Sequence, residues 1–201
     1  MAKCPRGFTL VELLISMSIF SVISGFVLVN FRAGARKDEL RLAADQVTTV
    51  VRDALARATA GARVDVCVAN AVAVVVPQGT SSCTNGGVLV QQIPPGWGVR
   101  FGIGSPNDMS LFADLNNNQL FDAGETYTTE VFSLSGFVQA AAATPSGQET
   151  VVVFSLPNPD VHINADPSQI EATLSLRHTV DSGQRTIRIN RVSRRVTIIV
   201  P

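Results

Sequence analysis

Residues 8–31 read FTLVELLISMSIFSVISGFVLVNF, and this stretch decides the fold of the chain. It contains one charged residue, Glu12. A helix over these residues would be about 36 Å long, which is enough to cross a hydrocarbon core of about 30 Å. We therefore predict a transmembrane helix over residues 8–31, behind a short leader over residues 1–7 that carries Lys3 and Arg6.

Glu12 lies near the start of this apolar helix, where a carboxylate needs a partner. Such a group costs about 2.5–3.5 kcal/mol at the centre of a bilayer and less near the interface. One partner is local, because Thr9-x-x-Glu12 has the spacing of a capping box. The other is a charge: cleavage between Gly7 and Phe8 would leave a free amine about 6 Å from Glu12 along a helix. The residues alone leave both interpretations open.

An ordinary secretory signal peptide is an alternative for the same stretch. Ala33-Gly34-Ala35 has the small-residue pattern of its cleavage site, so the product would be a secreted periplasmic protein that begins after Ala35. Three features disfavour this alternative. The apolar run exceeds the usual core of about 7–15 residues, it carries a carboxylate near its start, and Arg32 lies close to the cleavage site.

The pattern becomes amphipathic over residues 32–60. Apolar residues recur there at the spacing of one helix face, no Pro interrupts residues 8–60, and Gly61 is a plausible stop. We predict one long helix whose second half packs an apolar stripe against a globular head. The stripe consists of Leu40, Ala43, Ala44, Val47, Val50, Val51, Ala54, Leu55 and Ala58.

The remaining residues, 61–201, form a β-rich head. Short runs rich in β-branched residues are separated by clusters of Gly, Pro, Asn and Ser, and residues 140–147 and 157–167 are predicted loops. We predict the fold class α+β, with the helix on a largely antiparallel β-sheet. The predicted strands are 64–68, 71–76, 88–93, 98–101, 109–113, 128–132, 151–156, 173–177, 185–190 and 195–200.

The amino-acid composition and the absence of common catalytic motifs exclude several classes of function. The chain has 201 residues, of which 46% are hydrophobic and only 16% are charged, so intrinsic disorder is not expected. Its 16 basic and 16 acidic residues give no net charge, which disfavours a nucleic-acid footprint over the whole surface. The sequence contains no P-loop, no G-x-S-x-G and no H-E-x-x-H motif, so we do not expect an enzyme.

The segment Gly7-Phe8-Thr9-Leu10-Val11-Glu12-Leu13-Leu14 resembles the class III signal of type IV pilins and type II secretion pseudopilins. The resemblance implies that a prepilin peptidase cleaves after Gly7, that Phe8 is N-methylated, and that Glu12 helps to recruit and register subunits in a filament. It also implies a single-pass protein of the inner membrane with its head in the periplasm. Its partners would be other pilin or pseudopilin subunits.

The order of later features resembles the minor pseudopilins of the GspH/FimT type. An Ala/Arg-rich helix end runs into a first strand with a Cys, and a Cys-bearing loop, Trp97-Gly98, an Asp/Asn-rich turn and a closing hairpin follow. The implied role is a minor subunit of a type IV pilus or a type II secretion filament, and the sequence does not separate these two. The hairpin turn reads Val192-Ser193-Arg194, where that family tends to carry a Gly.

The chain has three Cys, and removal of the leader would take away Cys4. An even pair in an extracytoplasmic domain favours a disulfide, here between Cys67 and Cys83. The closed loop would contribute roughly 3 kcal/mol to stability in the chain-entropy model.

The loop from Asp114 to Glu125 has the ligand spacing of an EF-hand. It departs from that motif at its sixth position, which is Gln119 rather than Gly, and its flanks are predicted strands. We therefore weigh a Ca²⁺ site against an Asn/Asp-rich turn that satisfies its own backbone. The Ca²⁺ ligands would be Asp114, Asn116, Asn118, Asp122 and Glu125 through their side chains and Leu120 through its carbonyl.

Arginines concentrate near the C-terminus, and some FimT-type pilins bind DNA through such a hairpin. The candidate DNA-binding residues are Arg188, Arg191, Arg194 and Arg195. The alternative is a solvated strand face whose arginines counter the acidic residues Asp160, Glu171 and Asp181. No Tyr or Trp lies among these arginines to stack on bases.

Overall fold

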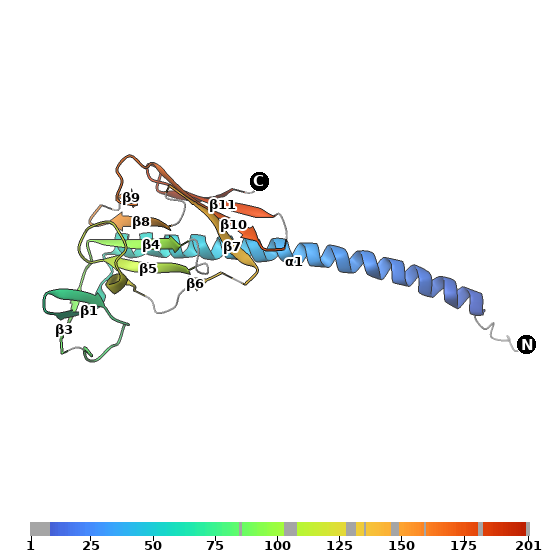
Figure 1. The fold of residues 1–201 in the computed structure, drawn as a ribbon, viewed down its shortest axis with the longest axis horizontal. Coiled ribbons are helices and arrows are strands. Elements are labelled where there is room, and N and C mark those ends of the chain that lie inside the picture. Colours follow the sequence, from blue (N-terminus) through green and yellow to red (C-terminus); the bar gives the residue numbers. More distant parts are fainter. Residues whose placement is uncertain are drawn as a thin grey trace, which may run out of the picture. The chain divides into compact units, whose positions relative to one another are not determined.

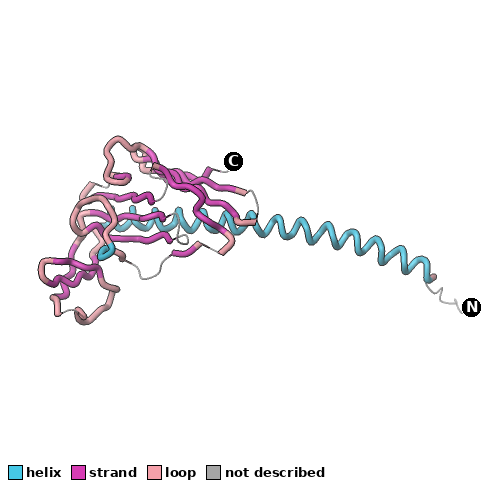
Figure 2. The backbone as a smooth tube through the Cα atoms, viewed as in Figure 1, coloured by secondary structure: helices cyan, strands magenta, loops and turns pink. Residues whose placement is uncertain are grey.

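The computed structural model of the chain describes residues 9–84, 86–102, 108–127, 132–134, 136–145, 149–158, 160–180 and 183–199. The predicted leader and the processing residues Gly7 and Phe8 lie outside this part. The chain divides into two compact units, Met1–Asp38 and Glu39–Pro201. Figure 1 labels the elements and Figure 2 separates helix from strand.

A single helix, α1 (Leu10–Ala60), belongs to both units. It confirms the predicted continuous helix. In the N-terminal unit its apolar side chains are exposed along the segment 10–31, from Leu10 at 77% to Phe31 at 75%. A window of this helix has a mean hydropathy of 2.1 and buries none of its residues, so the helix is long and apolar enough to cross a membrane.

The second half of α1 packs into the core of the C-terminal unit. Of the predicted stripe, every residue except Leu55 is buried, and Leu55 packs at the margin of the same core. Thr48 is also buried on this part of the helix. Its hydroxyl donates to the carbonyl of Ala44 at 2.8 Å and therefore needs no water.

Beyond α1, the described residues of this unit form three antiparallel sheets, where one largely antiparallel sheet was predicted. The largest has the order β6-β5-β4-β8-β9. Its central strand, β4, pairs with β5 and β8, and Figure 1 shows these three strands running along the second half of α1. The bounds are β4 Gly96–Gly102, β5 Asp108–Asp114, β6 Phe132–Ser133, β8 Glu149–Ser155 and β9 Val161–Ile163.

The second sheet has the order β12-β11-β10-β7. Its strands alternate between buried and exposed residues, and Leu174, Leu176 and Ile187 join the core that contains α1. The bounds are β7 Val138–Thr144, β10 Glu171–His178, β11 Gln184–Asn190 and β12 Arg195–Ile199.

The third sheet is small and has the order β2-β1-β3. Its strand β1 (Val64–Ala69) follows α1 directly and buries Val64 and Val66 in the core. Strands β2 (Val72–Val75) and β3 (Val88–Gln92) keep most of their apolar side chains exposed, among them Val72 at 61% and Val88 at 68%.

Two segments that were predicted to be loops contain strands in the structure. The first, over 140–147, lies partly in β7, whose alanines have low strand propensity but pair with β10 in register. The second, over 157–167, contains the short strand β9, which pairs with β8. Of the strand predicted over 128–132, only Phe132 lies in the described part, and it belongs to β6.

Candidate functional site

Glu12 caps the first turn of α1 in the single chain. Its backbone N–H donates to the hydroxyl oxygen of Thr9 at 3.3 Å, and its carboxylate accepts from the Thr9 N–H at 3.5 Å and from the Thr9 hydroxyl at 3.4 Å. This is the predicted capping box. Glu12 is nevertheless exposed among exposed apolar side chains, so its carboxylate also remains accessible to a cation from another chain.

The apolar surface around Glu12 is the larger feature of this unit. Large hydrophobic side chains between residues 10 and 31 are exposed on every side of the helix, and none of those that the structure describes is covered by the rest of the chain. A helix that is apolar all round requires a lipid or protein environment. Within the described residues, α1 offers this surface to both a bilayer and a bundle of like helices.

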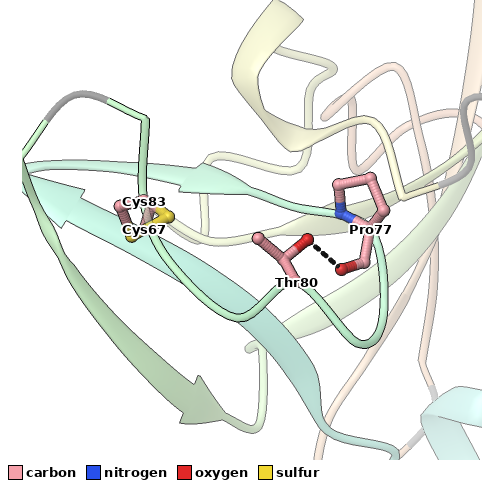
Figure 3. The surroundings of a disulfide bond; sticks show 4 residues. All are labelled: Cys67, Pro77, Thr80 and Cys83. Carbon is pink, nitrogen blue, oxygen red and sulfur yellow. Dashed lines mark hydrogen bonds between the residues drawn. A yellow bond between two sulfur atoms is a disulfide. The ribbon is translucent and has the colours of Figure 1, made fainter.

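A disulfide between Cys67 and Cys83 ties β1 to the loop between β2 and β3 (Figure 3). The two Cα atoms are 5.7 Å apart, and inside the closed loop the Thr80 hydroxyl donates to the Pro77 carbonyl at 2.6 Å. The structure therefore contains the expected pair. Because the small sheet leaves much of its apolar surface exposed, covalent closure compensates for its limited core.

Loss of this disulfide is expected to destabilise the small sheet by about 3 kcal/mol, since an open loop of this length gains chain entropy when unfolded. The double variant Cys67→Ser/Cys83→Ser should match the wild-type chain treated with reductant, and reductant should not change the variant further. Hydrogen exchange of the β1 to β3 amides measures the effect. Equal protection in the oxidised wild-type chain and the variant would contradict it.

The predicted oxygen ligands lie in the loop between β5 and the 3-10 helix η1 (Ala123–Glu125). Their side chains bond to one another and to backbone N–H groups of the same loop. The Asp122 carboxylate accepts from the side-chain amides of Asn116 at 2.8 Å and Asn118 at 2.9 Å. Glu125 accepts from the backbone N–H groups of Leu115 at 2.8 Å and Asp122 at 3.2 Å. These contacts are those of the self-satisfied turn.

Burial changes the acidity of two groups in this loop. Asp114 is fully buried, and Glu125 is 3% exposed. Burial raises the pKa of Asp114, with backbone hydrogen bonds acting against it, and burial likewise raises the pKa of Glu125. Within the part of the chain that the structure describes, no three Asp, Glu, His or Cys side chains gather closely enough to hold a metal ion by themselves.

The C-terminal hairpin uses most of its candidate DNA-binding arginines internally. Arg188 pairs with Glu171 at 2.8 Å, Arg194 pairs with Asp160 at 3.1 Å, and Arg191 donates to the Pro167 carbonyl at 2.5 Å. Two of these partners are the acidic residues that the alternative interpretation named. Asp181 lies outside the described residues.

The turn of the C-terminal hairpin forms without the glycine that the GspH/FimT-type family tends to carry there. Arg194 has φ 53°, so it adopts the left-handed conformation that a Gly would supply. The Asn190 side chain stabilises the turn by accepting from both the N–H and the hydroxyl of Ser193, at 2.9 and 3.1 Å.

An aromatic cluster around Trp97 was not predicted from the sequence. The Trp97 ring meets the Tyr127 ring edge-on, with centroids 4.9 Å apart. The Arg57 guanidinium lies 5.3 Å from the Trp97 centroid and 4.5 Å from the Tyr127 centroid, and its Nε donates to Asp53 at 2.9 Å. The cluster connects the end of α1 to the largest sheet, and only the spatial contact of three distant segments reveals it.

Comparison with protein families matches residues 3–28 to a prokaryotic N-terminal methylation motif. Comparisons with curated proteins and with solved structures gave no match. The motif covers the predicted cleavage site, Glu12 and most of the predicted transmembrane segment, and proteins with this motif are structural subunits rather than enzymes. It fits a single-pass inner-membrane anchor. The motif, the long apolar helix and the antiparallel sheets together support a type IV pilin-like subunit that begins with a prepilin signal.

Proposed function

We propose that this chain is a minor pilin or pseudopilin of the GspH/FimT type, with a structural and assembly-priming role in a type IV pilus or a type II secretion filament. The methylation motif over residues 3–28 carries this proposal. The exposed apolar surface of α1 supports it, because such a surface can be buried first in a bilayer and then in a filament core. Extraction from the bilayer would expose this apolar surface to water. Burial in the filament core removes it from water again, which is worth about 25 cal/mol per Å².

The minor-subunit assignment draws on the head. Strand β1 carries Cys67 immediately after α1, Trp97-Gly98 lies in the central strand of the largest sheet, and the Asp/Asn-rich loop follows β5. The chain closes with the hairpin of β11 and β12. This order of elements is the one that the resemblance implies.

Assembly proceeds from the membrane in this proposal. The prepilin peptidase cleaves after Gly7 on the cytoplasmic side, Phe8 is methylated, and residues 8–31 hold the chain in the inner membrane with its head in the periplasm. The amine of Phe8 then meets Glu12 of a neighbouring subunit, so that an ion pair stabilises a carboxylate that lipid disfavours. DNA binding gains less support, because three of the four candidate arginines have partners within the chain.

Intact-mass and peptide mass spectrometry of the chain purified from membranes tests the proposal. The expected N-terminus is methylated Phe8, with residues 1–7 absent. The same chain expressed in a strain without prepilin peptidase is the control, and it should retain Met1 and the leader. A mature N-terminus at Arg36 would instead establish an ordinary signal peptide, and an unprocessed chain in the presence of the peptidase would also contradict the proposal.

A further inference from the structure

Strand β3 forms an outer edge of the small sheet (Figure 1). Its residues read VLVQQ and carry no charge. Val88 is 68% exposed, Val90 41% and Leu89 36%, so apolar side chains on both faces of this strand meet solvent. A free edge presents unpaired backbone donors and acceptors to which another strand can add, and an exposed apolar edge favours that addition.

The register of the small sheet shows which backbone groups of β3 face outward. The Val76 N–H donates to the Asp65 carbonyl at 2.9 Å, so Asp65 turns its backbone groups toward β2. These directions alternate along an antiparallel strand, so the next residue of β1 turns toward β3, where it pairs with Val90. The N–H and C=O groups of Leu89 and Gln91 therefore face away from β1, and no residue in the described part of the chain bonds to them.

The other strand edges of the head are protected in ways that natural sheets use against pairing. Strands β6 and β9 are only two and three residues long. The register of β7 shifts at Ala141, so its edge is irregular, and β12 carries the exposed Arg195. The 3-10 helix η1 lies along β2, where a Cβ added at Gly124 would be 3.8 Å from the Ala73 carbonyl. Among the described strands, β3 has none of these protections.

We propose that β3 pairs with β3 of a second copy of this chain, antiparallel and about a two-fold axis at Val90. This register overlaps the whole strand. Leu89 of each copy lies opposite Gln91 of the other, so their outward N–H and C=O groups exchange hydrogen bonds. Val88 of each copy lies opposite Gln92, and the two Val90 side chains meet at the axis. Because β3 is uncharged, self-pairing brings no like charges together.

The pairing joins two small sheets into one continuous sheet, through an isologous contact. A single strand pair buries less surface than a standard interface, so we expect a reversible dimer rather than a permanent one. The contact lies in the C-terminal unit, whereas the prepilin signal lies in the N-terminal unit. Processing after Gly7 and pairing at β3 are therefore independent, and either can fail without the other.

Cysteine cross-linking of the full chain in detergent tests the register. Val90→Cys, in a Cys4→Ser background, puts two thiols at the axis. The Cα atoms of such a directly opposite pair are about 4.5 Å apart, which is within the range of a disulfide. Oxidation with copper phenanthroline should convert this variant to a covalent dimer that reductant reverses.

Val88→Cys is the matched control, because it lies on the same strand and the same face but is about 13 Å along the strand from its counterpart. It should stay monomeric by itself. A mixture of Val88→Cys and Gln92→Cys chains should cross-link, since these two positions lie opposite each other. Equal cross-linking of Val90→Cys and Val88→Cys would indicate random collision and would overturn the proposal.

Sedimentation equilibrium of the same detergent-solubilised chain measures the non-covalent association. Val90→Lys places two like charges at the axis and should weaken the dimer more than tenfold. Val88→Lys, which lies opposite Gln92, should associate like the wild-type chain. The proposal is wrong if both lysine variants associate equally, or if Val90→Cys gives no covalent dimer, as it would if a strand from a different protein occupied this edge.

Discussion

Glu12→Gln is expected to reduce incorporation of the chain into filaments by more than tenfold. Gln can still serve a capping box, so the contacts with Thr9 are preserved while the negative charge is lost. If the charge pairs with the amine of a neighbouring subunit, its removal leaves that amine unpaired in an apolar filament core, at a cost of about 3–5 kcal/mol. The measurement is the amount of the chain in sheared filaments relative to the amount in the membrane.

Thr9→Ala is the matched control for this prediction. It removes the cap, which is worth about 1 kcal/mol, and leaves the carboxylate in place. We expect membrane insertion to be unaffected by either variant and filament incorporation to be lost only in Glu12→Gln. The opposite pattern, with normal incorporation of Glu12→Gln and loss in Thr9→Ala, would show that Glu12 acts only as a cap.

Trp97→Ala is expected to destabilise the head by about 3–5 kcal/mol, because it leaves a cavity in a fully buried site. It also removes the ring on which Tyr127 and Arg57 pack. Trp97→Phe should cost much less, since the indole N–H has no hydrogen-bond partner among the described residues and the Phe ring fills part of the space. Pulse proteolysis in urea, applied to the full chain in detergent, measures both variants.

Equal losses in Trp97→Ala and Trp97→Phe would contradict this account. They would indicate that the indole contributes through its N–H rather than through its packed ring. A small loss in Trp97→Ala would show that the end of α1 is held to the largest sheet mainly by its aliphatic stripe, without the aromatic cluster.

Several parts of the fold could be predicted because their signals are local. The stripe from Leu40 to Ala58 has a helical period, and the burial of its members follows from that period. Most strands were located to within a few residues, because β-branched runs alternate with turn residues. Strand β7 was missed, since its alanines acquire strand structure only by pairing with β10.

The candidate sites, too, could be predicted only where their signal lies in the sequence itself. The charge distribution suggested that Asp160, Glu171 and Asp181 counter the arginines as a group. The structure shows which residues pair, with Arg188 on Glu171 and Arg194 on Asp160. His178 is buried on β10, and its Nε2 lies 3.2 Å from a carboxylate oxygen of Glu39. Its burial depends on the packing of β10 against α1, for which a lone His in the sequence gives no signal.

The sequence by itself determined the prepilin signal, the continuous helix and the abrupt change at its middle from an all-round apolar surface to a single stripe. These properties depend on residues that are adjacent or one helical turn apart. The local order of residue types is therefore sufficient to predict them. Only the tertiary structure decided that the described residues of the head form three sheets and that Arg57 packs on Trp97 and Tyr127. It also decided that Asp114 is buried with one oxygen that has no hydrogen-bond partner among those residues. Those properties arise from contacts between distant segments, whose pairing is selected by the packing of the whole core.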